Sequence, residues 1–397
     1  MMRVRLPPAV IALGFVSLCM DASSELIHGL LPVFMVSVLG VSALSVGVIE
    51  GIAEATAAIV KVFSGTLSDW LGRRKPLVLL GYGLAALTKP LFPLAHGLGL
   101  VLAARFIDRI GKGIRGAPRD ALVADITPPQ WRGAAYGLRQ SMDTVGAFIG
   151  PALAMLLMAA TRDNFRLVFW AAVPPAAIAV LLVTFAVREP PAAAARPRRG
   201  APIHRRELRR LSSAYWLVAG FASILTLARF SEAFLLLRAG TLGWSPTYVP
   251  LVLIVMNVVY AASAWPFGHW SDRMDRRRLL LPGIGLLIVA DLLLALASST
   301  AWLLAGTVFW GLHMGATQGL LTALVADTAP VDLRGTAFGL FNLLTGVALL
   351  AASVLAGALW EWTGPASTFA AGAGFSVLAL LGLLTVTRPG SPPATGG

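Results

Sequence analysis

Cysteine is almost absent from this 397-residue chain, and acidic residues are scarce. The single cysteine, Cys19, excludes an internal disulfide framework and any metal cluster built from the cysteines of one chain. There are 19 Asp and Glu against 32 Lys and Arg, and charged residues make up only 13% of the sequence. A soluble domain is about one quarter charged, so this composition indicates lipid as the main solvent.

The sequence also lacks the short motifs of common catalytic sites. It contains no Gly-x-Ser-x-Gly nucleophile turn, no His-Glu-x-x-His zinc motif and no phosphate-binding Gly-x-x-x-x-Gly-Lys-Ser/Thr loop. The missing phosphate loop excludes a self-contained ATP-driven pump. We expect a protein that is not an enzyme, with no catalytic residues, no cofactor and no resident metal.

Long apolar stretches follow one another almost from end to end. Each has about 20 residues, enough for a helix to cross about 30 Å of hydrocarbon. None alternates with the two-residue period of a barrel strand. The sequence therefore predicts an all-α membrane protein with twelve transmembrane helices, near residues 9–38, 42–64, 76–95, 98–120, 134–160, 166–187, 213–237, 247–267, 279–298, 301–325, 336–360 and 366–387.

The net charge of +13 is that of many nucleic-acid-binding proteins, but its placement indicates topology instead. With the N-terminus in the cytoplasm, most Lys and Arg fall in cytoplasmic loops, and only Arg162, Arg166 and Arg238 fall on the other side. This positive-inside bias places both termini in the cytoplasm. We expect a multi-pass protein of a bacterial inner membrane, with the lipid bilayer and not nucleic acid as its partner.

The one long polar interval, residues 188–212, contains many Pro, Ala and Arg residues. This composition is typical of a linker that lies against a membrane surface. It separates six predicted helices from six. The predicted domains are an N-terminal bundle at 1–187 and a C-terminal bundle at 213–397.

The two halves repeat each other. GTLSDWLGRRK at 65–75 returns as GHWSDRMDRRR at 268–278, and LVADITPPQWRGAAYGL at 122–138 returns as LVADTAPVDLRGTAFGL at 324–340. Both copies are displaced by nearly the same number of residues, which indicates a duplicated six-helix unit. Parallel repeats of this kind place the substrate site between the halves, near the middle of the bilayer.

These residues carry a family resemblance. The loop Gly65-x-Leu67-x-Asp69-x-x-Gly72-Arg73-Arg74 resembles the signature between helices 2 and 3 of the major facilitator superfamily. The segment Gly146-x-x-x-Gly150-Pro151 resembles the helix 5 motif of its antiporters, with Ala152 and Leu153 in place of a further glycine pair. The resemblance implies two six-helix bundles that rock to alternate access, usually driven by a proton gradient. We also expect a functional monomer.

The repeated loops predict the gates. Asp69 lies where a helix end meets basic residues, so its carboxylate is placed to accept charge-assisted hydrogen bonds that hold one access state. The alternative is a solvated loop that only sets topology. The predicted gate residues are Gly65, Asp69, Gly72, Arg73, Arg74, Asp125, Arg132, Asp272, Arg276, Asp327 and Arg334.

Ionisable residues inside the predicted spans are concentrated in the first half. On helix 1, Asp21, Glu25 and His28 share one face, because three- and four-residue spacings align along a helix. The proton affinity of a carboxylate depends on its solvation and on nearby cations, so Asp21 and Glu25 are the predicted proton carriers. The alternatives are a permanent ion pair with helix 4 and a hard-metal site that includes His28.

Helix 4 carries a basic ladder of Arg105, Arg109, Lys112 and Arg119, and the corresponding positions of the second half are uncharged. This asymmetry predicts that coupling or polar substrate chemistry belongs to the first half. The ladder has two interpretations, an anion-binding wall or a structural partner for acidic side chains. The predicted cavity residues are Ser24, His28, Arg109, Lys112, Arg139, Asp143, Arg229, Glu232, Asn257, Tyr260, His313, Gln318 and Asn342.

The leading functional hypothesis is a proton-coupled transporter that exports small molecules by antiport. The acidic face of helix 1 and the Gly-Pro motif of helix 5 favour it. The alternative within transport is movement of an anionic solute, a metal ion or a metal chelate. A non-transporting sensor and an intramembrane enzyme are remote alternatives.

Overall fold

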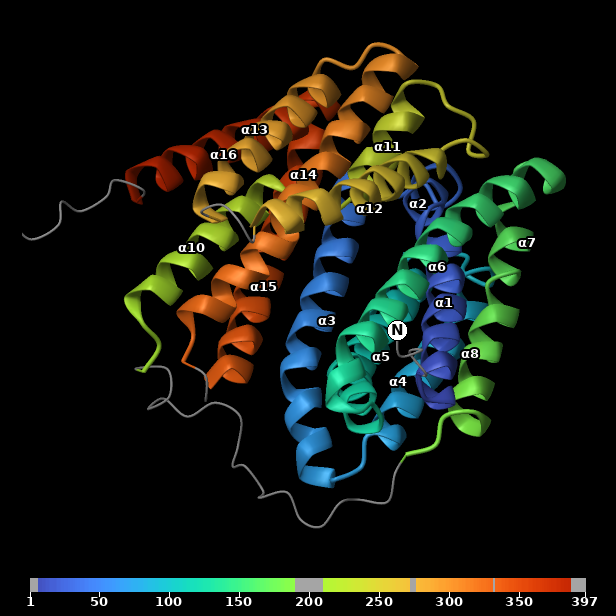
Figure 1. Cartoon of the computed structure of the whole chain (residues 1–397). Coiled ribbons are helices and arrows are strands. Elements are labelled where there is room, and N and C mark those ends of the chain that lie inside the picture. Colours follow the sequence, from blue (N-terminus) through green and yellow to red (C-terminus); the bar gives the residue numbers. More distant parts are fainter. Residues whose placement is uncertain (1–5, 190–209, 272–275, 331–332, 387–397) are drawn as a thin grey trace, which may run out of the picture.

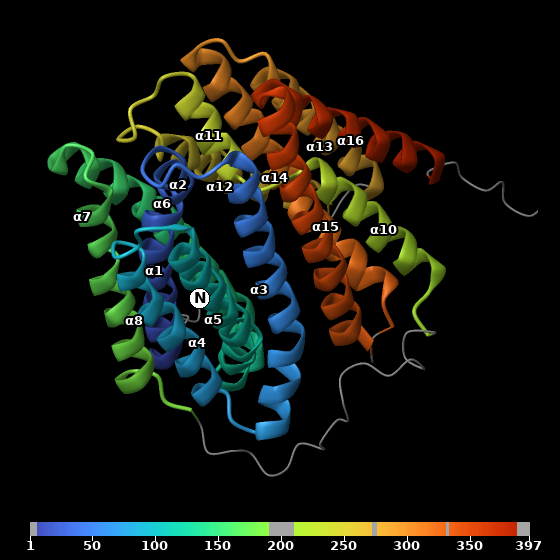
Figure 2. The same ribbon diagram turned by 180° about the vertical axis from the view of Figure 1, so that it is seen from behind.

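The computed structural model describes residues 6–189, 210–271, 276–330 and 333–386, with the side chains of a few helix-end residues left undescribed. All the regular structure in these ranges is helical. The helices form two bundles, one coloured blue to green and one yellow to red (Figures 1 and 2). The predicted boundary at 188–212 stays a prediction, because residues 190–209 lie outside the described ranges.

The first bundle comprises eight α-helices and two short 3-10 turns. They are α1 (Pro8–His28), α2 (Leu31–Ser37), α3 (Ala43–Leu71), α4 (Lys75–Thr88), η1 (Lys89–Leu91), α5 (Leu98–Ile126), η2 (Pro129–Trp131), α6 (Arg132–Thr161), α7 (Phe165–Trp170) and α8 (Val173–Phe185).

The second bundle is built from longer, less interrupted helices. They are α10 (Ser213–Ala228), α11 (Ala233–Thr241), α12 (Leu251–Ser271), α13 (Arg276–Ala295), α14 (Thr300–Thr328), α15 (Arg334–Thr363) and α16 (Pro365–Val386).

All twelve predicted spans are helical, but three of them are broken. The first breaks at Gly29, shortly before Pro32, and the sixth breaks between α7 and α8, shortly before Pro174. Proline lacks the N–H that continues a helix and clashes with the preceding turn. The seventh breaks at residues 229–232. Ten stretches of the described residues are long and apolar enough to cross a membrane; the other two spans are the short α4 and the highly charged α5.

The signature segment at 65–75 is more helical than the loop that the sequence predicts. Helix α3 continues through Leu71, so Gly65 and Asp69 lie on its final turns. The helix ends at Gly72, whose φ of 65° is in the left-handed region. Glycine is favoured there because it has no Cβ to clash. The gate motif is therefore the C-terminal end of a helix.

The bundles meet along α3 and α15, which lie side by side in both views (Figures 1 and 2). A Cβ added to Gly47 would lie 2.2 Å from Ser353 O, and one added to Gly51 would lie 2.8 Å from Leu350 Cδ1. Small residues let membrane helices approach closely and gain van der Waals contact. Glycine on α3 thus holds the two bundles together along this seam.

The bundles are also joined on the side opposite the predicted cytoplasmic loops. Asp163, just after α6, accepts a hydrogen bond from Thr247 Oγ1 at 2.5 Å and one from Ser245 Oγ at 3.3 Å. On the same side α2 packs against α11. The protein is therefore closed on the side that its charge distribution predicts to be extracellular.

Candidate functional site

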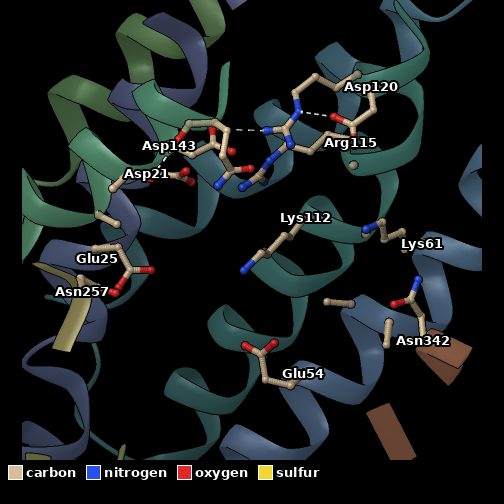
Figure 3. Close-up of a pocket in the computed structure, with 18 of the residues that line it drawn as sticks. Asp21, Glu25, Glu54, Lys61, Lys112, Arg115, Asp120, Asp143, Asn257 and Asn342 are labelled. Carbon is tan, nitrogen blue, oxygen red and sulfur yellow. Dashed lines mark hydrogen bonds and ion pairs between the residues drawn. The ribbon is translucent and has the colours of Figure 1, made fainter. Parts of the chain in front are cut away.

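A cavity of about 430 Å³ lies between the bundles (Figure 3). Its walls come from α1, α3, α5 and α6 of the first bundle and from α12 and α15 of the second. Its polar lining residues are Asp21, Glu25, Glu54, Lys61, Lys112, Arg115, Arg119, Asp120, Gln140, Asp143, Thr144, Asn257, Tyr260 and Asn342. All of these charged lining residues come from the first half.

The glycines of the helix 5 motif set the position of the acidic face of α1. A Cβ at Gly146 would lie 2.7 Å from Leu18 O and 3.0 Å from Asp21 Cβ. A Cβ at Gly150 would lie 2.7 Å from both Ala22 O and Glu25 Cβ. Helix α6 therefore packs its glycines directly against the turns of α1 that carry the two predicted proton carriers.

This packing predicts a large effect of Gly150→Ala. The added methyl group has no room, so α1 must move away and shift Asp21 and Glu25; such overpacking typically costs about 1–3 kcal/mol. We expect a lower melting temperature and impaired transport, measured on the purified and reconstituted protein. Gly137→Ala on the same helix is the control, because no atom lies within 4 Å of its new Cβ. Equal behaviour of the two variants would refute this role of the motif.

Several charged groups in the cavity lack partners in the described structure, among them Asp21, Lys61 and Lys112. Within the described ranges, Asp21 and Lys112 form no side-chain hydrogen bond and no ion pair. Figure 3 shows Lys112 pointing from α5 into the space between Glu25 and Glu54, with Asp21 on the same wall as Glu25. A group without a fixed partner is free to exchange a proton or to bind a solute, so Asp21 and Lys112 are candidates for these roles.

His28 belongs to a buried network rather than to the cavity wall, which corrects its predicted position. Its Nδ1 lies 3.6 Å from Glu25 Oε2, and its Nε2 lies 3.3 Å from Glu50 Oε2. Glu50 in turn receives a two-pronged bond from Arg105, at 2.7 and 3.1 Å. This chain links the acidic face of α1 through α3 to α5.

Arg109 and Ser24 are likewise placed outside the cavity wall. Arg109 is 4% exposed and pairs with Glu54 at 3.3 Å, because its position on α5 faces α3. Ser24 accepts a hydrogen bond from Lys89 Nζ at 2.9 Å, and Lys89 also binds Asp108 at 3.0 Å. The basic ladder thus divides, with Arg105 and Arg109 paired to acids and Lys112 in the cavity.

A second ionic cluster lies at the junction of α5 and α6. Arg139 Nη1 donates to Asp143 Oδ2 at 2.6 Å, and Arg139 Nε lies 3.6 Å from Asp120. Arg119 donates to Asp120 at 3.3 Å and lies 4.0 Å from Asp143. Asp143 lines the cavity, whereas Arg139 stands behind it as its partner and is not one of the lining residues.

The second half supplies Asn257, Tyr260 and Asn342 to the cavity, as the sequence predicts. His313 is not among the lining residues: it is fully buried in α14, and its Nδ1 lies 2.8 Å from Gly283 O. Gln318 does not line the cavity itself, but it accepts a hydrogen bond from the lining residue Tyr260.

Arg229 and Glu232 occupy the break between α10 and α11 and are not lining residues either. Polarity inside a predicted span had indicated all of these positions, but it does not distinguish a cavity from a helix break or a buried contact.

Two of the described gate residues, Arg74 and Asp125, contact each other within the first bundle. Arg74 Nε lies 3.5 Å from Asp125 Oδ2, and Arg74 also donates to Ser68 and, through its backbone, to Glu189. Gly65 lies on α3, Asp327 lies on α14, and Arg73 and Arg132 are exposed. Asp272 and the side chains of Asp69, Arg276 and Arg334 lie outside the described part. The gate role stays a prediction.

Two features were not anticipated from the sequence. Asp163 joins the bundles, and no repeated motif marks it, although positive φ angles at Arg162 and Asp163 show a tight turn there. Lys89 is 2% exposed at the end of α4, and the high cost of a buried ammonium group could have singled it out.

The metal-site hypothesis finds no geometric support. Asp21, Glu25 and His28 share a face of α1, but His28 lies between Glu25 and Glu50, and Asp21 is separate from them. Within the described residues, no group of three or more His, Cys, Asp or Glu side chains is arranged to hold a metal ion. The helix 1 face is therefore not proposed as a metal site.

Comparison with known proteins now adds to this geometry. The sequence matches the profile of the Major Facilitator Superfamily over residues 13–240 and 223–397. It is 33% identical to an uncharacterized MFS-type transporter of Methanocaldococcus jannaschii, over 94% of this chain and 93% of that protein. It is 26% identical to the multidrug resistance protein MdtH of Edwardsiella ictaluri, over 90% of this chain and 87% of that protein.

Solved structures show the same fold. The nucleoside transporter NupG superposes with a TM-score of 0.78 at 14% identity, covering 96% of this chain and 100% of that one. A POT family transporter in complex with 5-aminolevulinic acid superposes with a TM-score of 0.79 at 14% identity, covering 96% and 95%. With its apolar spans, two bundles and central polar cavity, the chain belongs to the major facilitator superfamily and is a multi-pass secondary transporter of a small molecule.

Proposed function

We propose that the protein exports a small molecule in exchange for protons. The observation that carries the proposal is Asp21, an unpaired carboxylate in a cavity between two bundles that are joined on the predicted extracellular side. A mid-membrane carboxylate is costly to insert and is functional by default. Here it lies beside Lys112 and Arg119, whose positive charges compete with a bound proton.

An exchange cycle follows from this arrangement. In the state described, the bundles are joined at Asp163 on the predicted extracellular side. A solute would therefore enter the cavity from the cytoplasmic side and meet Asp21 and Glu25 there. Binding of a solute changes the solvation and electrostatics of both carboxylates and releases their protons. Rocking of the bundles then exposes the site to the other side, where the acids are reprotonated as the solute leaves.

The relatives support export. The MdtH proteins are named for multidrug resistance, and the glycine motif that resembles that of antiporters holds α6 against the acidic face of α1. The cavity volume of about 430 Å³ is in the range of small-molecule sites.

Proton release tests the proposal. Purified protein in weakly buffered detergent solution would be mixed with cationic drugs, organic acids, metal ions and metal–citrate complexes, with pH recorded by an indicator dye. We expect protons to be released with at least one of these compounds and release to be lost in Asp21→Asn. Binding of a compound without proton release in the wild type would contradict proton exchange.

Lys112 favours a second candidate, transport of an anionic solute. It is exposed in the cavity and has no acidic partner within the described ranges, whereas the neighbouring Arg105 and Arg109 are paired. An ammonium group in this setting is available to bind a carboxylate or phosphate.

The variants Lys112→Gln and Arg109→Gln, both on α5, distinguish an anion-binding residue from a structural one. If the solute is an anion, Lys112→Gln should raise its dissociation constant roughly tenfold to a hundredfold, the effect of losing a hydrogen bond to a charged group. Its melting temperature should be unchanged. Arg109→Gln should lower the melting temperature instead, because it removes a buried guanidinium that lies 3.3 Å from Glu54 and 4.0 Å from the buried Asp108. Calorimetric binding and thermal melting on both variants provide the measurement, and unaltered binding by Lys112→Gln would refute the anion site.

A further inference from the structure

A second carboxylate without a partner lies in the other bundle, away from the cavity. Asp291 on α13 is 0% exposed, and neither of its carboxylate oxygens has a hydrogen-bond partner within the described residues. Helix α13 packs against α14 and α16, and α16 carries no ionisable side chain. An ionised group here would have neither water nor a counter-charge.

The carboxylate faces the break in the seventh transmembrane segment. A Cβ added to Gly372 of α16 would lie 2.8 Å from Asp291 Oδ2 and 3.1 Å from Ala228 O. Both oxygens therefore converge on the same side of Gly372. Ala228 is the last residue of α10, and no described group donates a hydrogen bond to its carbonyl oxygen. Such a terminal carbonyl carries the negative end of the helix dipole.

In the described structure, no charged group near α13 pairs with Asp291. The guanidinium of Arg238 on α11 donates to the carbonyl oxygens at the end of α13, Leu294 at 3.0 Å, Ala295 at 3.3 Å and Ala297 at 2.7 Å. His313 on α14 is bonded to Gly283 O. Arg229 and Glu232, in the break itself, form no ion pair with Asp291 in the described structure. None of these groups neutralises the carboxylate.

Asp291 Oδ2 and Ala228 O both lie close to the position that a Cβ of Gly372 would occupy, and no described group donates a hydrogen bond to either oxygen. An ionised carboxylate is strongly disfavoured when it is removed from water, and the negative end of α10 disfavours it further. A protonated carboxyl group instead donates its O–H to a carbonyl and satisfies both oxygens. A proton needs no extra space, whereas Na⁺ needs several further oxygen ligands at close distance.

We propose that Asp291 is a second proton-binding site, whose proton is shared with the carbonyl group of Ala228 at the break between α10 and α11. Helix α11 packs against α2 on the closed side of the protein. The bound proton therefore stabilises the geometry of the break in this closed state. Any state that moves α11 binds the proton with a different affinity, so proton occupancy and closure are linked. The site depends neither on export nor on the identity of the solute.

Infrared difference spectroscopy tests the proposal without transport. Purified wild-type protein at neutral pH should show the C=O stretch of a protonated carboxylic acid, and Asp291→Asn should lose one component of this band. Asp143→Asn is the matched control, because Asp143 has a cationic partner, Arg139, at 2.6 Å, whereas Asp291 has none, and we expect this variant to leave the band unchanged. If Asp291→Asn does not fold, Asp291→Ser is used instead. It keeps a small hydrogen-bond donor, and its difference spectrum against the wild type should show the same lost band component.

An unchanged band in the Asp291 variant would overturn the proposal. Binding of Na⁺ at Asp291 would also overturn the proposal. In that case NaCl would raise the melting temperature of the wild type but not that of Asp291→Asn, and choline chloride would have no effect on either protein. The link to closure is tested with spin labels at Val36 and Gly240, on α2 and α11, in a Cys19→Ser background. Their separation should vary with pH in the wild type and stay at the closed value in Asp291→Asn, and a pH dependence that survives in the variant would overturn the linkage.

Discussion

Asp21→Asn is expected to abolish transport driven by a pH gradient while leaving solute exchange without a gradient largely intact. The amide fills the same volume as the carboxyl group but cannot take up or release a proton, so coupling is lost and the solute path remains. Because Asp21 forms no hydrogen bond or ion pair within the described residues, its replacement should hardly change the melting temperature. Uphill uptake and equilibrium exchange into proteoliposomes measure the two activities separately.

Glu25→Gln should impair uphill transport as well, with an added effect on the network through His28, which lies 3.6 Å from Glu25. Glu232→Gln is a comparison on the other bundle, since Glu232 does not line the cavity. Normal uphill transport by both Asp21→Asn and Glu25→Gln would remove α1 from the coupling mechanism.

Glu50→Gln is expected to have the largest effect on stability. Glu50 is 1% exposed and Arg105 is 3% exposed, and their two-pronged bond is the shortest charged contact between α3 and α5, at 2.7 Å. Removal of one member of a buried pair leaves an uncompensated charge and typically destabilises by about 3–5 kcal/mol. The expected result is a large fall in melting temperature and a low yield of folded protein.

Two comparisons test this explanation. Glu54→Gln, one turn further along α3, should cost far less, because Glu54 is 29% exposed and water can replace its contact with Arg109. The double variant Glu50→Leu and Arg105→Leu should recover much of the lost stability, since a well-packed apolar pair often substitutes for a buried ion pair. If Glu50→Gln melts like the wild type, the pair is not structural.

The number, order and helical type of the spans were predictable because a bilayer requires long apolar helices and leaves few other solutions. The helix breaks were not. The sequence around Ala228 and Arg229 is apolar enough to continue a helix, and only tertiary packing reveals that α10 ends there. The resemblance predicts a loop at 65–75 between two spans, but α3 continues through Leu71 and ends at Gly72.

The candidate site shows a similar limit. Helical spacing placed Asp21 and Glu25 on one face of α1, and both line the cavity. Helical spacing also grouped Arg109 with Lys112 on one face of α5. Side chains three residues apart still point in somewhat different directions, so Arg109 pairs with Glu54 whereas Lys112 lines the cavity. Which polar residue is a partner and which is free depends on the neighbouring helices, so this distinction needed the structure.

The glycine pair of α6 gives the strongest connection between motif and mechanism. Sequence alone indicated only a resemblance to antiporters. In the structure, Gly146 and Gly150 touch the turns of α1 that carry Asp21 and Glu25. The motif therefore acts through close packing, and it sets where the predicted proton carriers lie.

The central claim is that solute leaves in exchange for protons through Asp21. The most direct measurement uses proteoliposomes loaded with a compound that releases protons from the purified protein, with a pH-sensitive dye inside. An outward solute gradient should drive protons inward in wild-type vesicles, and Asp21→Asn vesicles should release solute with no change in internal pH. Solute efflux from wild-type vesicles without proton entry, or with protons leaving alongside the solute, would contradict the account.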